Sequence, residues 1–276
     1  MKVSFYGVRG SCPCPCPANQ RYGGNTASIA LAVEGEDPIL LDLGTGLRLL
    51  ADDCPTDGTF RGTALVTHIH WDHVQGLPFF PPVHVPGAVL DIYGPEQAEG
   101  PLEDVFNGFM RPPYFPVQFS QLQGDIRFIG VKNEIFSIGH AKVIVRPVPH
   151  VGATVGYRIE WDGRTVAYIS DHQAPLDLET VAPEVLELCE DADLVIHDAQ
   201  YTRAEFAQKS DWGHCTTDYA VRVAAMARAR HLVLFHHDPA HDDDQLDGIL
   251  AETRCLAQAV GVPKVTAAYE GLRIEL

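Results

Sequence analysis

Thr67-His68-Ile69-His70-Trp71-Asp72-His73 places four potential metal ligands within six residues. The stretch follows the apolar run Ala64-Leu65-Val66, so we expect its histidines to emerge at the end of a strand. The first two histidines are two residues apart and point to the same side of an extended segment. Imidazole and carboxylate donors suit Zn²⁺, and a cluster this dense needs a compensating positive charge. We predict a metal site here; the alternative is a polar loop that is rich in histidine by chance.

Five further motifs accompany this stretch. They are Gly23-Gly24-Asn25-Thr26, Asp42-Leu43-Gly44-Thr45-Gly46, Pro149-His150, Ser170-Asp171 and Phe235-His236-His237. Together with the HxHxDH signature they resemble the metallo-β-lactamase superfamily over nearly the whole chain. The resemblance is closest to the branch of ribonuclease Z and the small cyclic phosphodiesterases, such as phosphoribosyl cyclic phosphodiesterase. It implies an α/β (α+β) fold, a four-layer αββα sandwich with the metals at one edge between two sheets.

The resemblance also implies two metal ions that share a hydroxide. We expect two Zn²⁺ per chain, although sites made of histidine and aspartate also accept Mn²⁺ or Fe²⁺. The implied ligands are His68, His70 and His150 for one ion, Asp72, His73 and His236 for the other, and Asp171 as the carboxylate that bridges them.

The downstream ligands have alternative interpretations. His150 follows the apolar run Val143-Ile144-Val145, but a lone histidine in such a position more often lies on the surface. Asp171 ends another apolar run, and its alternative is a turn residue that caps a helix. His236 and His237 are adjacent, and motif alignment favours His236. The neighbouring His237, Asp238 or His241 would then be supporting partners of the ligands.

A further pair of motifs narrows the chemistry. His197-Asp198-Ala199-Gln200-Tyr201 and Gly213-His214-Cys215-Thr216 match two motifs that ribonuclease Z relatives carry in this order. The resemblance implies that Asp198 orients His214, which donates a proton to the leaving alkoxide. Ribonuclease Z typically has Glu where this chain has Asp198, so the side chain here is one methylene shorter. The alternative is that His214 only caps the helix that begins near Thr217.

The implied reaction is hydrolysis of a phosphodiester. Two cations lower the pKa of water, so a hydroxide between them survives at neutral pH. A leaving alkoxide then needs a proton, which His214 would supply with Asp198 behind it. Together with Asp72 of the signature, these two residues are the implied catalytic residues. One alternative is a thioester or lactone hydrolase with the same metals, and another is a ribonuclease Z-like nuclease. A diiron redox protein is disfavoured, because relatives with that role replace the second signature histidine, here His70, with Glu.

Composition favours a small substrate. The chain has 276 residues, with 20 Lys+Arg against 37 Asp+Glu and a formal net charge of -17. Such a chain repels a polyphosphate backbone unless a basic patch compensates, and no run of Lys or Arg supplies one. The segment Phe109–Val117 is aromatic and fixed by proline, unlike the basic, glycine-rich arm with which ribonuclease Z grips transfer RNA. We therefore expect a small phosphodiester and no large nucleic acid, with this segment as a lid or as the contact of a homodimer.

The remaining features favour one cytoplasmic domain. The N-terminus lacks the apolar core and cleavage site of a signal peptide, and no apolar run approaches the ~20 residues that cross a bilayer. Seven scattered cysteines do not resemble a secreted disulfide framework. No linker or repeat divides the chain, so we expect residues 1–276 to form one domain. In Cys12-Pro13-Cys14-Pro15-Cys16-Pro17 the alternating prolines favour an extended loop at the rim of the active site over a thiolate metal site.

Apolar runs and turn residues outline the secondary structure. We expect helices at Leu47–Asp52, Pro95–Met110, Leu178–Cys189, Thr217–Arg228 and Asp243–Val260. We expect strands at Lys2–Val8, Ser28–Glu34, Ile39–Leu43, Thr63–Thr67, Val89–Tyr93, Ile126–Val131, Lys142–Pro147, Thr154–Glu160, Thr165–Ser170, Leu194–Ile196, Leu232–Phe235 and Val265–Ala268. Asp162-Gly163 marks a hairpin turn. The turn that begins at Asp42 either supports the metal site or is a simple glycine turn.

Overall fold

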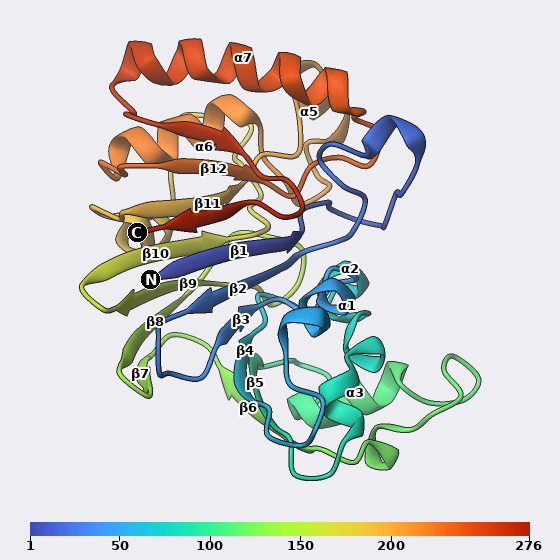
Figure 1. Cartoon of the computed structure of the whole chain (residues 1–276). Helices are drawn as coiled ribbons and strands as arrows, with labels where there is room; N and C mark the ends of the chain where they lie inside the picture. Colours follow the sequence, from blue (N-terminus) through green and yellow to red (C-terminus); the bar gives the residue numbers. More distant parts are fainter.

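Two mixed seven-stranded sheets form the centre of the molecule, which the computed structural model describes over residues 1–276 (Figure 1). In spatial order, the first sheet consists of β14 (Arg273–Glu275), β1 (Lys2–Gly7), β2 (Ser28–Ala32), β3 (Ile39–Leu41), β4 (Arg61–Leu65), β5 (Val89–Pro95) and β6 (Asp125–Val131). The second consists of β13 (Val265–Ala267), β12 (Leu232–Phe235), β11 (Leu194–Asp198), β10 (Arg164–Ile169), β9 (Val155–Trp161), β8 (Ala141–Pro147) and β7 (Ile135–Ile138). The chain completes the first sheet before it enters the second, except that β14 returns to pair antiparallel with β1.

Alternate residues of the strands in the second sheet face two separate hydrophobic cores. Ile196 of β11 and Val233 of β12 face the core between the sheets. Their neighbours Val195 and Leu234 point the other way, into a core that helices cover. Because side chains alternate across a strand and both faces are buried here, β12 is apolar along its whole length and β11 is apolar from Leu194 to Ile196. That continuity allowed the sequence to predict them.

Helices cover the outer face of each sheet and complete four layers (Figure 1). On the first sheet lie α1 (Leu47–Leu50), α2 (Trp71–Val74) and α3 (Leu102–Phe109), and on the second α4 (Pro183–Cys189), α5 (Arg203–Lys209), α6 (Thr217–Met226) and α7 (Asp243–Val260). This is the αββα arrangement that the resemblance implied. None of these helices combines the length and the apolar character needed to span a bilayer.

Four helices are shorter than predicted: α1 and α6 each end two residues early, and proline shortens the other two. The helix predicted at Leu178–Cys189 begins at Pro183, because the ring of proline suits the first turn of a helix. The helix predicted at Pro95–Met110 is confined to α3, whose N-terminal cap is Pro101. Four elements were not predicted from the sequence, β7, β14, α2 and α5, which are short and carry little periodicity.

Elements with strong local signals lie where the sequence placed them. α7 has the predicted bounds, because Asp242 caps its first turn and Gly261 ends it in the left-handed conformation. The β9–β10 hairpin is confirmed: Asp162 and Gly163 both adopt positive φ, 53° and 69°, as a tight two-residue turn requires.

The carboxyl ends of the parallel strands meet at one edge of the sandwich. β3 to β6 run parallel in the first sheet, and β10 to β13 run parallel in the second. In such sheets ligands bind beyond the carboxyl ends of the strands. β4 leads into the loop that carries His68, and β12 leads into His236. The predicted ligands of both sheets are therefore directed to the same edge.

Candidate metal centre

The loop after β4 presents four donors at this edge. His68 is buried, and its Nε2 has no hydrogen-bond partner. α2 begins directly after His70, so Asp72 and His73 fall on its first turn and are both buried. Asp72 Oδ2 lies 3.1 Å from His73 Nε2, whereas His70 is exposed. This short segment thus carries one exposed and three buried donor side chains.

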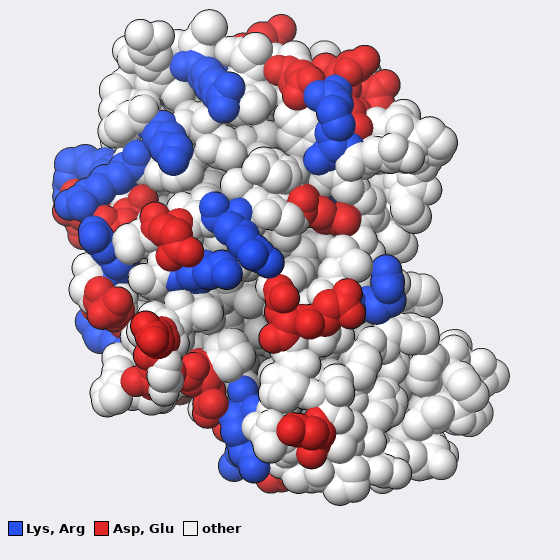
Figure 2. Space-filling model, in the orientation of Figure 1, with Lys and Arg blue, Asp and Glu red and all other residues white.

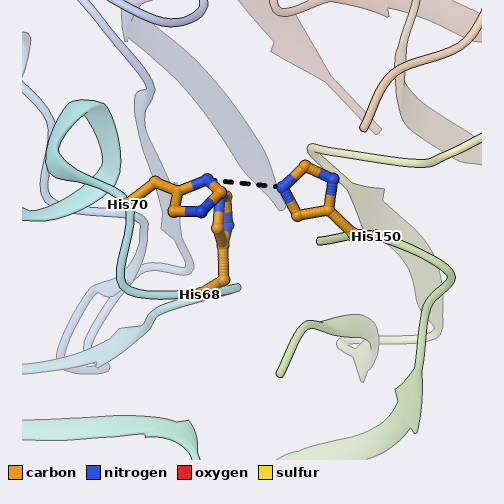
Figure 3. Close-up of side chains that lie close together, drawn as sticks. All are labelled: His68, His70 and His150. Carbon is orange, nitrogen blue, oxygen red and sulfur yellow. Dashed lines mark hydrogen bonds between the residues drawn. The ribbon is translucent and has the colours of Figure 1, made fainter. Parts of the chain in front are cut away.

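Three donors of the second sheet meet this loop. His150 comes from the β8–β9 connection, and its Nε2 lies 3.4 Å from Nδ1 of His70 (Figure 3). Asp171 follows β10 and is buried. His236 follows β12 in a left-handed conformation, with φ of 60°, and its Nε2 lies 3.1 Å from Oδ2 of Asp72. All seven predicted metal ligands therefore gather at one place.

Asp171 lies between two sets of donors. Its Oδ1 is 3.2 Å from His73 Nε2 and 3.4 Å from His236 Nε2. Its Oδ2 faces His68 and His150 instead, at 3.7 and 3.8 Å from their Nε2 atoms. Four groups have donor atoms within 4.8 Å of one another: His68, His70 and His150; Asp72, His73 and His236; His68, His73 and Asp171; and Asp171, His214 and His236. The first two groups are the sets that the resemblance implied, and each oxygen of Asp171 faces one of them.

The charges of the cluster call for a cation. Burial holds the pKa of His68 well below its usual range, so this imidazole is neutral, the form that binds metals. Burial alone would raise the pKa of Asp171, but the charges of His236 and His73 outweigh it and hold that pKa well below its usual range. Burial likewise opposes protonation of His73, yet Asp72 and Asp171 raise its pKa well above the usual value. The carboxylates thus draw positive charge into a buried site.

A metal ion fits this donor set. A buried polar atom without a partner costs about 1–3 kcal/mol, and Nε2 of His68 is such an atom. Histidine nitrogens and carboxylate oxygens are ligands of Zn²⁺ and of related divalent ions. A cation would satisfy Nε2 and also replace the protons that the carboxylates otherwise attract to the imidazoles.

Hydrogen bonds from behind orient the ligands. Nδ1 of His73 lies 2.8 Å from Oδ2 of Asp42, which also accepts a hydrogen bond of 2.6 Å from the hydroxyl of Tyr168. Nδ1 of His236 lies 2.8 Å from Oε1 of Gln200. A proton on Nδ1 leaves the lone pair of Nε2 directed at the cluster, which fixes both the tautomer and the ring orientation. Asp42 therefore supports a ligand, one of the two roles that its turn allowed.

Two supporting residues were not predicted from the sequence. Of the predicted supporting neighbours of His236, His237 instead donates through Nε2 to the carbonyl of Ala268. Gln200 was overlooked although it lies in the motif that ends β11. The backbone N–H of Ser11 donates to Oδ2 of Asp72 at 2.8 Å, a contact for which the sequence carries no signal.

Asp198 and His214 are paired beside the donors. His214 Nδ1 lies 3.0 Å from Asp198 Oδ2, and the backbone N–H groups of His172 and Gln200 also donate to the Asp198 carboxylate. Burial alone would lower the pKa of His214, but the charge and the hydrogen bond of Asp198 outweigh it, so the pKa is raised. His214 does not cap α6, because the cap is Thr216, whose side chain accepts from the third backbone N–H. The side chain of His214 also lines an open cavity, together with Asp72 and Asp171.

A protein-family model matches most of this arrangement. The model described as Beta-lactamase superfamily domain covers residues 40–237, more than half of the chain, including all the clustered donors. The chain belongs to this superfamily. As a β-lactamase superfamily member with the metallo-β-lactamase fold, it is a hydrolase that binds divalent metal.

Relatives of this β-lactamase superfamily protein include nucleases. Ribonuclease Z of Acaryochloris marina is 26% identical over 326 residues, which cover 100% of this chain and 98% of the relative. Ribonuclease Z of Myxococcus xanthus is 28% identical, over 89% of this chain and 91% of the relative. The human short-form tRNase Z superposes with a TM-score of 0.69 at 22% identity, covering 100% of this chain and 99% of that one. A diphosphatase of the PhnP family gives 0.71 at 21%, covering 100% and 96%. At these identities the two structures show the shared fold.

Two other predicted segments lie near the centre of this superfamily member. Cys12-Pro13-Cys14-Pro15-Cys16-Pro17 directly follows Ser11, which lines the cavity, but none of its own six residues lines it. Its thiols join no group of metal donors, and Sγ of Cys14 accepts a hydrogen bond from Asn19. Phe109–Val117 does not cover the donors; it borders an apolar groove beside α2.

Proposed function

We propose that this hydrolase is a phosphodiesterase that cleaves small cyclic or short linear phosphodiesters with two Zn²⁺ ions, or Mn²⁺ or Fe²⁺ in their place. His68, His70 and His150 would hold one ion, Asp72, His73 and His236 the other, and Asp171 both. When bound, such ions supply Lewis acidity and lower the pKa of water. The buried carboxylates and the imidazoles described above would hold them.

The observation that carries this proposal is the Asp198–His214 pair. A leaving alkoxide is a strong base and departs with a proton, which a general acid within reach of the leaving oxygen supplies. His214 lines the same cavity as Asp171, and Asp198 holds its Nδ1 and favours its protonated form. His214 thus donates a proton through Nε2, and Asp198 orients it.

The surface supports a small substrate. The formal net charge is -17, and on the face drawn in Figure 2 Lys and Arg lie interspersed with Asp and Glu without forming a continuous basic area. An RNA backbone is bound mainly through phosphate contacts to Lys and Arg. A diester that fits between the donors and the cavity rim needs no such surface.

A ribonuclease is the second candidate, because the curated relatives are ribonucleases Z. A thioester or lactone hydrolase is the third, since the same donors would serve it. Purified protein should be assayed for metal content and with bis(p-nitrophenyl) phosphate, cyclic nucleotides, a thioester, a lactone and precursor transfer RNA. We expect turnover of the small diesters. Exclusive cleavage of RNA, or of the thioester or lactone, would refute the proposal.

We also propose that the reaction takes place in the cytoplasm. All seven cysteines are free thiols, and three of them, Cys12, Cys16 and Cys255, are exposed. Exposed free thiols persist in a reducing compartment. Cell fractionation that recovers the protein with a periplasmic or secreted marker would contradict this placement.

A further inference from the structure

Two exposed tryptophans stand at the mouth of the metal centre. An open cavity of about 590 Å³ lies in front of the donors, and both Trp71 of α2 and Trp212 of the α5–α6 connection line it. Their exposed fractions are 71% and 62%, whereas the third tryptophan of the chain, Trp161, is buried. Large aromatic side chains that are exposed to solvent around a cavity are typical of a ligand-binding or interaction surface.

Apolar surface continues from this mouth. Trp71 also lines a groove of about 240 Å³ with residues of the Phe109–Val117 segment. The rings of Phe79 and Phe115 meet edge to face in its wall, with centroids 5.8 Å apart. On the face drawn in Figure 2, the part of the molecule around α3 is mostly uncharged, although Glu103, Asp104 and Arg111 are exposed in α3 and just after it. Trp71 is thus shared by the cavity in front of the metal donors and by this aromatic groove.

The mouth lacks a group that could hold a second phosphate. No Lys or Arg lines the cavity, and Asp211 adds a negative charge beside Trp212. Lys209 lies outside the cavity lining, with its Nζ 5.5 Å from the ring of Trp212, and is already paired with Asp238 at 3.0 Å. A substrate with an additional phosphate would meet uncompensated negative charge here.

We propose that Trp71 and Trp212 form a stacking subsite for the planar base of a nucleoside phosphodiester. The inference rests on the proposed phosphodiesterase function and narrows it. Among the small diesters, it favours those with an uncharged nucleobase over phosphorylated sugars. Aromatic stacking tolerates any base, because each presents a π-face, and the reactive phosphate would lie beside Asp171 and His214 in the same cavity.

Two chromogenic esters with the same leaving group test the subsite. Thymidine 5′-(p-nitrophenyl phosphate) carries a base, and methyl p-nitrophenyl phosphate does not. We expect the metal-loaded wild-type protein to prefer the thymidine ester. Trp71→Ala and Trp212→Ala should each lower the ratio of the two kcat/KM values by about 5- to 150-fold, mainly through KM. Trp71→Phe should retain most of the preference. Ile135→Ala, which truncates an exposed apolar side chain on β7, is the matched control and should leave the ratio unchanged.

A binding measurement separates this inference from the proposed function. Two of the three tryptophans lie in the subsite, so thymidine alone should quench the intrinsic fluorescence, and each Trp→Ala variant should weaken the effect. If neither ester is hydrolysed, the phosphodiesterase proposal fails, and the thymidine titration still decides whether the subsite exists. An ester ratio and a titration that the Trp variants leave unchanged would overturn the subsite alone. A change of oligomeric state in Trp71→Ala with no change in either measurement would identify a subunit contact instead, and would also overturn it.

Discussion

The two sheets furnish the metal centre in different ways. The first sheet delivers its four donors on one loop after β4, within six residues of chain. The second sheet delivers His150, Asp171 and His236 singly, each beyond the end of a different buried strand. Donors on one short loop are brought together by local geometry. Donors on separate strands meet only if the sheet is assembled in the correct register.

The dense cluster on the loop after β4 does not by itself determine metal binding. The loop after β4 cannot complete either set of donors alone, because each set takes one histidine from the second sheet. Asp171, also from the second sheet, contacts both sets. A single residue of the second sheet should therefore affect the whole centre.

The largest expected effect is that of Asp171→Ala. It should remove most of the metal from both positions, because it deletes the carboxylate that faces both sets; the wild type should hold about two ions per chain. Metal content by mass spectrometry measures this. Asp177→Ala, in the same connection but exposed, is the control and should keep its metal. A full complement of metal in Asp171→Ala would show that the other six donors hold both ions without this carboxylate.

The next effect tests the chemistry that the second sheet contributes. His214→Ala should keep both metals but lower turnover of diesters with alkoxide leaving groups by ~10²–10⁴-fold, the usual contribution of a general acid. The loss should shrink for p-nitrophenolate, which departs without a proton. Steady-state kinetics on the two leaving groups decide the matter.

His214 also lies in a donor group with Asp171 and His236, so a role as ligand is the competing assignment. Loss of metal in His214→Ala would establish that role and remove the general acid from the mechanism. Equal losses on good and poor leaving groups would make His214 a substrate-binding residue.

A smaller effect should follow from removing a support behind one set only. Gln200→Leu should weaken metal binding at the position of His236 by about 10- to 100-fold, because the orientation of that ring is lost. The position of His68, His70 and His150 should keep its affinity. Titration with Zn²⁺ should then resolve two phases where the wild type shows closer affinities. Equal weakening at both positions would mean that Gln200 supports the fold of the edge as a whole.

The smallest effect is a displacement of the pH profile. Asp198 helps to raise the pKa of His214, so the acid form persists to higher pH, and activity falls as the pH rises through that pKa. Asp198→Asn removes the charge and should move this alkaline limb down by about one to three pH units. The loss of turnover at neutral pH should be smaller than in His214→Ala. An unchanged limb would exclude His214 as the titrating acid.

Secondary structure could be predicted from the sequence where neighbouring residues determine it, as at helix caps and tight turns. The capped α7 and the Asp162-Gly163 hairpin lie as predicted, because their caps and turns act within a few residues. β7 and β14 were missed, because such short edge strands are strands only by pairing with β8 and β1. The site shows the same division. The HxHxDH loop could be recognised from its own residues, whereas Ser11 reaches Asp72 across 61 residues of chain.

By itself, the sequence determined which side chains can bind a metal, that they follow apolar runs, and that the chain carries a formal net charge of -17. Only the tertiary structure decided that His236 enters the centre while His237 points to Ala268. His236 adopts a left-handed conformation that a non-glycine residue keeps only where its surroundings hold it. Its contact with Asp72 joins residues 164 positions apart. No local preference encodes such a contact, because it exists only after the two sheets have packed.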